Sequence, residues 1–90
     1  MEKREYNGWK NYETWCVNLW LDNDEGSHYA VRELIENNID EENWHVAAML
    51  KEMVEEMNPL NDSATVWTDL LNGALSEVNW LEIIEAAKED

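Results

Sequence analysis

The chain has 90 residues, of which 21 are acidic and 6 are basic, so its formal net charge is −15 at pH 7 with neutral histidines. This length supports one domain with a modest core, and the hydrophobic content of 44% excludes a compositionally disordered chain. We therefore predict a single domain over residues 1–90. Direct binding to a nucleic-acid backbone or to an anionic membrane is disfavoured, because both need basic side chains; the charge instead predicts a basic protein surface as partner.

The cysteine count and the N-terminal segment bear on where the protein acts. Cys16 is the single cysteine, so an intramolecular disulfide is impossible, which is typical of the reducing cytoplasm. The first ten residues lack the apolar stretch of a signal peptide, and all apolar runs are far shorter than the roughly 20 residues that span a bilayer. These features predict a cytoplasmic protein without a membrane segment.

The chain begins with a polar entry at residues 1–10, and we expect a helical core over residues 11–88. Asn11 is a suitable N-cap for a first helix that reaches about Asp22. Spacings of three and four residues predict an inward face of Tyr12, Trp15, Cys16, Leu19 and Trp20. On this interpretation the aromatic rings form the core rather than a base-stacking platform, which would need basic surroundings, and Trp9 is the ring expected to stay partly exposed.

Turn residues at 23–27 separate this helix from a second one. Asp24 can cap the second helix, which is expected to extend to about Asn37. Its inward side chains are predicted to be Val31, Leu34 and Ile35.

The third helix is predicted to be the longest, with Asp40 as its N-cap and its end at Asn58 and Pro59, since proline disfavours helical geometry in the preceding residue. Glu41 and Glu42 then lie in the first turn, where the helix dipole favours negative charge. The apolar stripe is expected to consist of Val46, Leu50, Met53, Val54 and Met57. The opposite face is expected to carry Glu41, His45, Ala48, Glu52, Glu55 and Glu56, with three glutamates close together near its end.

Two shorter helices complete the chain. The fourth is predicted from Ser63 to about Val78, with Gly73 weakening it and with Trp67, Leu70, Leu71 and Ala74 facing inward. The pair Asn79 and Glu82 resembles a capping box for a fifth helix, whose inward residues are Leu81, Ile83, Ile84 and Ala87. No useful strand alternation occurs, so the predicted class is all-α, with four to five short helices.

Catalytic and metal-binding patterns are weak. Asp22, Asp24 and Glu33 match acidic positions of a calcium-binding loop, but Gly26 comes one residue too early in it. The two histidines lie on different predicted helices without cysteines at zinc-binding spacing. Cys16 is expected to be a core thiol rather than a nucleophile, and no glycine-rich phosphate loop is present. We predict a protein that is not an enzyme and that has no metal or cofactor.

The size of the negative charge suggests a specific use. A solvated surface that maintains solubility accounts for a magnitude of about 8 in a small domain, and −15 exceeds this. A basic partner or adaptation to high salt could each explain the excess.

Two segments resemble a known family. The head GWKNYETWCVNLWLDNDEG and the tail LLNGALSEVNWLEI are similar to the signature segments of small, mostly uncharacterised proteins of phages, plasmids and other mobile elements. The resemblance extends from Asn7 to about Glu85 and brings no catalytic residues with it. It implies a mobile-element context, in which, by analogy, small acidic proteins often counter host defence, some of them by imitating DNA.

The leading hypothesis is therefore an acidic inhibitor that blocks a nucleic-acid-binding surface of a host defence nuclease, either a restriction enzyme or a CRISPR effector. The predicted partner-binding residues are Asp22, Asp24, Glu25, Glu41, Glu52, Glu55, Glu56 and Trp9. The alternative is an interaction module of phage or plasmid replication or regulation, possible as a homodimer, that binds through aromatic surface.

Overall fold

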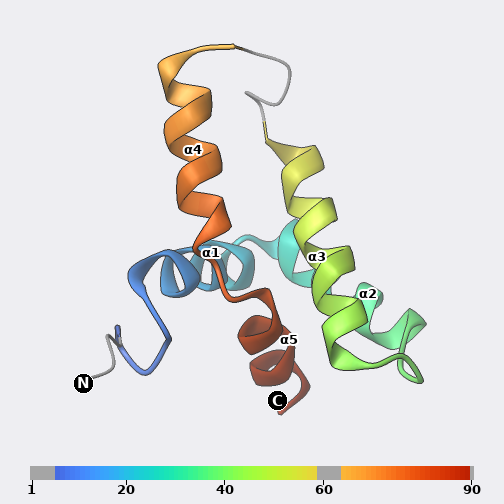
Figure 1. Ribbon diagram of the computed structural model, residues 1–90. Helices are drawn as coiled ribbons and strands as arrows, with labels where there is room; N and C mark the ends of the chain where they lie inside the picture. The colour runs from blue at the N-terminus through green and yellow to red at the C-terminus, as the bar shows by residue number, and fades with distance from the viewer. Residues whose placement is uncertain (1–5, 59–63, 90) are drawn as a thin grey trace.

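The computed structural model describes residues 6–58 and 64–89, and these contain five α-helices and no strand (Figure 1). The helices are α1 (Tyr12–Asn23), α2 (Glu25–Asn37), α3 (Asn43–Met57), α4 (Val66–Ser76) and α5 (Trp80–Lys88). The predicted all-α class is confirmed. Pro59 and Ser63, the predicted end of one helix and start of the next, lie outside the described residues.

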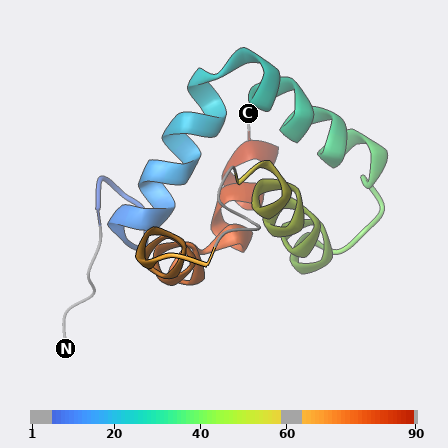
Figure 2. The ribbon, with the colours of Figure 1, turned by 90° about the horizontal axis from the view of Figure 1, so that it is seen from above.

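The core is built around α5. In Figure 2, α1 and α2 meet at an angle and enclose α5, and α3 closes the other side of it. Ile83 and Ile84 of α5 are fully buried, as are Val46 and Leu50 of α3. The remaining buried apolar side chains are Leu21, Val31, Ile35, Ala47, Leu75, Val78 and Trp80.

Helix α4 is attached to this core mainly at one end. Leu75 is buried and Leu71 packs against the core from outside, whereas the first turns of α4 point away from the other helices (Figure 1). The predicted inward positions Trp67, Leu70 and Ala74 are exposed, so the predicted face of α4 is wrong. The buried residues of α4 are Thr68 and Leu75, so the side of the helix that carries Trp67, Leu70 and Ala74 faces outward.

The helix starts follow their capping residues. Asn11, Asp24 and Asn79 each accept a hydrogen bond from the backbone N–H three residues later, at 2.9, 2.9 and 3.1 Å, as the sequence predicts. Thr65 caps α4 in the same way. Cap interactions of this kind satisfy N–H groups that the helix leaves free.

The predicted start of α3 is two residues too early. The helix begins at Asn43, and its N-cap Glu42 makes no side-chain capping hydrogen bond. Asp40 lies instead in a turn, in which the Glu41 N–H donates to the Asn38 carbonyl. This turn places Glu41 before the helix rather than in its first turn.

The predicted inward face of α1 is also wrong. Thr14 and Leu21 are its buried residues, whereas Tyr12, Leu19 and Trp20 are exposed. Apolar side chains surround this helix, so their spacing does not select one face. The faces of α2 and α5 match the prediction except at Leu81, which is exposed, and on α3 the terminal Met57 is half exposed.

A polar junction explains why Thr14 faces inward. Its hydroxyl donates to Asn11 Oδ1 at 2.6 Å and accepts from the Asn79 N–H at 2.8 Å. Asn11 Nδ2 donates to the Glu77 carbonyl at 2.7 Å, and the Lys10 N–H donates to Glu82 Oε1 at 3.1 Å. The head and tail segments singled out in the sequence thus meet, and the N-cap of α1 is bonded to the chain at the start of α5.

The segment before α1 forms a tight turn that the sequence interpretation missed. Tyr6 and Trp9 exchange two backbone hydrogen bonds, with Asn7 at φ 50° and Gly8 at φ 87° between them. An Asn-Gly pair is the usual signal for such a turn, because both positions need positive φ. The turn lays the Tyr6 ring against Tyr12 and Trp15, with ring centroids 5.3 and 4.9 Å away.

Candidate partner-binding surface

The carboxylates of the described chain are not neutralised by lysine or arginine. The ion pairs found within residues 6–58 and 64–89 join Asp22 to His28 at 3.3 Å and Glu41 to His45 at 2.6 Å. Two of the few cationic side chains serve the fold instead. Arg32 donates to the carbonyl of Ala87, and Lys88 donates to Asn43 Oδ1, so both fasten the end of α5 to the helices around it.

The outward side of α3 presents acidic side chains. Glu52 and Glu56 are exposed and lie one turn apart, on the side of the helix opposite Leu50. Glu41 joins this side through its hydrogen bond with His45. We call Glu41, Glu52 and Glu56 the α3 acidic face. Glu55 is half-buried on its flank.

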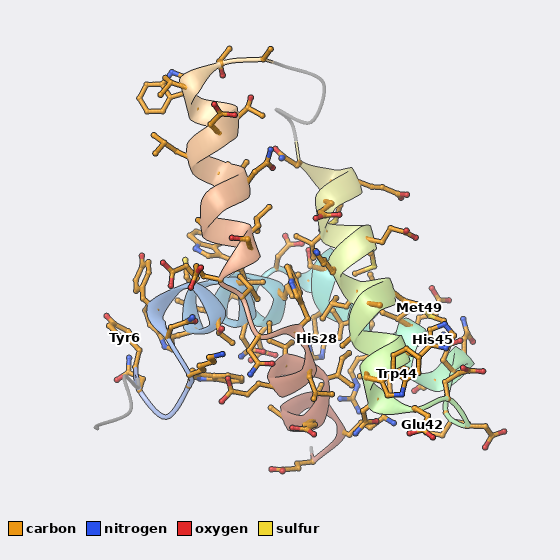
Figure 3. The ribbon with its side chains drawn as sticks, in the orientation of Figure 1. Tyr6, His28, Glu42, Trp44, His45 and Met49 are labelled. Carbon is orange, nitrogen blue, oxygen red and sulfur yellow. The ribbon has the colours of Figure 1, made fainter. Side chains whose placement is uncertain are left out.

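Trp44 lies beside the α3 acidic face and was missed by the sequence interpretation. Its ring is stacked on that of His45, with centroids 5.5 Å apart, at the N-terminal end of α3 (Figure 3). It lines a shallow hollow of about 510 Å³ together with acidic side chains of the preceding turn and of α5, namely Asp40, Glu41, Glu42 and Glu85. The available signal was its position in the helical period, which places it near Ala48 and Lys51 and away from the apolar stripe.

The acidic residues at the α1–α2 junction belong to a different part of the surface. Asp24 lines an apolar groove with Val54 and Met57, which lie on the side of α3 opposite Glu52 and Glu56. Asp22, Asp24 and Glu25 are exposed there. The structure therefore divides the predicted acidic residues between two surfaces.

Trp9 is less exposed than three other tryptophans. It is half-buried and packs against the core, whereas Trp20, Trp44 and Trp67 are 68%, 65% and 67% exposed. Trp9 lines a cavity of about 300 Å³ with Asp22, in which His28 and Arg32 also lie. The expectation that the tryptophans fill the core is wrong for these three rings, whereas Trp9 is partly exposed, as expected.

Two side chains in these regions have shifted proton affinities. The Ser27 hydroxyl and N–H groups, which hydrogen-bond to Asp24, hold the pKa of this carboxyl below its ordinary value of 3.8. A side-chain hydrogen bond with Cys16, followed by the charge of that thiol, raises the pKa of the Tyr12 hydroxyl above 10.0. Asp24 is thus charged, and Tyr12 neutral, at neutral pH.

The Asp24 cap should make stability depend on pH in a defined way. A carboxyl whose pKa is lowered by folding stabilises the protein fully above its unfolded value, and this contribution disappears as the pH falls through the lowered pKa. We expect the melting temperature of the native protein, relative to Asp24→Asn, to fall on acidification from pH 5 to below about 3.8. Asparagine keeps the cap and cannot titrate, so the difference isolates this carboxyl from the others. Parallel curves for the two proteins would contradict this role of Asp24.

Other kinds of site receive little support from the geometry. Over the ranges 6–58 and 64–89, no group of three or more histidine, cysteine, aspartate or glutamate side chains is arranged to hold a metal ion. Cys16 is half-buried on the wall of the groove rather than in the core. None of the helices that the structure describes is long and apolar enough to cross a membrane.

The comparison with known families agrees with the extent of the sequence signature. The chain belongs to DUF7249, a family of unknown function whose model matches residues 2–89. The match includes both the head and the tail segments that meet at the Thr14 junction. No curated protein and no solved structure matches the chain.

Proposed function

We propose that this protein is an acidic inhibitor, encoded by a mobile element and acting in the bacterial cytoplasm, that occupies a nucleic-acid-binding surface of a host defence nuclease. The class of target is a restriction enzyme or a CRISPR effector. In this proposal the protein binds without catalysis and without a cofactor.

The observation that carries the proposal is the unneutralised acidic surface. The net charge is −15, while Arg32 and Lys88 are used to hold α5 in place. A protein that leaves so many carboxylates without a lysine or arginine partner loses stability through self-repulsion. A complementary basic surface would remove that cost on binding and would also raise the association rate.

The α3 acidic face supplies the geometry for DNA mimicry. Glu52 and Glu56 are about 6 Å apart along the helix axis, whereas duplex DNA carries one charge per roughly 1.7 Å of its axis. One row of glutamates is therefore too sparse by itself. Asp40, Glu42 and Glu85, which surround Trp44, widen the acidic surface, and the exposed ring can anchor the contact.

A pull-down from host lysate tests the proposal. The tagged protein is incubated with lysate that contains candidate restriction and CRISPR complexes, and bound proteins are eluted with rising salt and identified by mass spectrometry. We expect a nuclease that leaves at moderate salt and that duplex DNA displaces, because both ligands use the same basic surface. A specific partner that neither salt nor DNA displaces would refute mimicry.

The second candidate function is a non-mimic interaction module in phage or plasmid replication or regulation. It is favoured by Trp20, Trp44 and Trp67, each about two-thirds exposed, since large apolar rings of this kind dominate many interfaces. This function predicts binding that is insensitive to salt and that is lost when one exposed ring is replaced by alanine. The same pull-down distinguishes it from inhibition by mimicry.

A further inference from the structure

An apolar groove lies between α1, α4 and the C-terminal part of α3. It has a volume of about 420 Å³ and is distinct from the α3 acidic face. Its walls are mainly apolar side chains from all three helices: Cys16, Val17, Trp20, Leu21, Val54, Met57, Leu71 and Leu75. The volume is within the range of pockets that bind ligands.

Side chains that line the groove remain exposed in the described part of the chain. Trp20 and Met57, which line it, are 68% and 50% exposed. Its α4 wall is held to the core mainly through Leu71 and Leu75, near one end of the helix. A contiguous exposed apolar surface of this kind usually marks a binding site, because covering it removes apolar area from water and lowers the free energy.

Charge decides which occupant fits the groove. Asp24 lines it, and among the described residues no lysine or arginine does, whereas Asp22 lines the separate cavity beside Trp9. A second copy of this chain would bring another 15 negative charges to the same place, which opposes close approach. A basic occupant is instead attracted both by the Asp24 carboxylate and by the net negative charge of the whole molecule.

We propose that the groove binds an amphipathic helix of a partner protein, with an apolar stripe flanked by lysine or arginine. The apolar side chains, at the three- and four-residue spacing of one helical face, enter between Trp20, Met57 and Leu71. The basic side chains face Asp24. Binding of the apolar face of an amphipathic helix in an apolar groove is a recurring mode of protein recognition. It does not rest on the inhibitory function proposed above, because it uses another surface of α3.

Synthetic peptides test the groove directly. The probe is a peptide of about 18 residues with leucines on one helical face and lysines elsewhere, at physiological ionic strength. Its controls are a scrambled peptide of the same composition and a leucine–glutamate peptide with the same stripe. Binding is followed by the tryptophan indole N–H signals in an ¹⁵N NMR spectrum and by titration calorimetry.

We expect the amphipathic leucine–lysine peptide to bind and to move the Trp20 indole signal while leaving the Trp67 signal in place. Trp20→Ala should weaken binding about tenfold or more, whereas Trp67→Ala, which removes an equally exposed ring that does not line the groove, should not. Both positions are at the surface, so neither variant should unfold the domain.

Three results would overturn the proposal. Equal binding of the scrambled peptide would show that charge alone attracts the probe, and equal binding of the leucine–glutamate peptide would show that the occupant need not be basic. Sedimentation of the free protein as a dimer that protects the Trp20 indole would assign the groove to a second copy. These peptide and sedimentation measurements involve no nuclease, so they would give the same results if the inhibitory function proposed above were wrong.

Discussion

Replacement of Thr14 by valine is expected to lower the free energy of unfolding by about 1–3 kcal/mol, the usual cost of leaving a buried hydrogen-bonding group without its partner. The Thr14 side chain is fully buried, and valine has nearly the same shape. What is lost is the acceptor for the Asn79 N–H and the second donor to Asn11 Oδ1. Urea denaturation is the suitable measurement, because an ionic denaturant would also screen the acidic surface.

Two comparisons separate the hydroxyl from the packing at this position. Thr14→Ser keeps the hydroxyl and removes one methyl group, so it should cost less than the valine substitution. The pair Thr14→Val and Asn11→Ala should be non-additive, since both residues belong to one hydrogen-bond network. If valine proves as stable as serine at this position, the hydroxyl does not hold the head and tail segments together.

The elements that the sequence predicts well are those with local physical signals. Asn11, Asp24 and Asn79 carry side chains that accept from the helix N-terminus, and the structure begins α1, α2 and α5 at these caps. The apolar spacing of α2 is likewise unambiguous, with Val31 and Ile35 buried. The third helix was predicted to start too early because Asp40 has the right chemistry for a cap but is already engaged in a turn.

The helix faces that were predicted wrongly depend on contacts between distant parts of the chain. On α1, hydrophobicity favours Trp20 as an inward residue, yet the junction between Thr14 and Asn79 rotates the helix so that Trp20 faces the groove. On α4, none of the described helices covers Trp67 and Leu70. Side-chain spacing cannot reveal either case, because it contains no information about which elements lie nearby.

The candidate surface was predictable in composition but not in arrangement. The glutamates of α3 were predicted to lie opposite its apolar stripe, and Glu52 and Glu56 do so. The separation of Asp24 from them follows only from the packing of the α1–α2 junction beside Met57. Trp44 was not predicted, because only its position in the helical period, near Ala48 and Lys51, indicates that this ring lies on the polar side of α3.

Reversal of three glutamates to lysine, Glu52, Glu55 and Glu56, is expected to weaken binding to the basic partner by about 100-fold or more. Each lysine removes an attraction and places like charges together at the interface, which costs several kcal/mol when the charges are close. The proper measurement is competition with duplex DNA for the recovered partner. Circular dichroism should show unchanged helicity, since Glu52 and Glu56 are exposed and none of the three caps a helix.

A matched variant distinguishes the α3 acidic face from net charge. Lysine at Glu33, Glu36 and Glu89 produces the same change in total charge on exposed positions of α2 and the end of the chain. If the partner recognises the arrangement of carboxylates on α3, this control retains most of its affinity. Its association rate should still fall, because long-range electrostatic attraction governs that rate. Equal loss in both variants would instead mean that the partner responds to the overall field of the protein. In that case the position of Glu52 and Glu56 on the helix does not contribute to recognition, and the hypothesis that this face imitates DNA would be wrong.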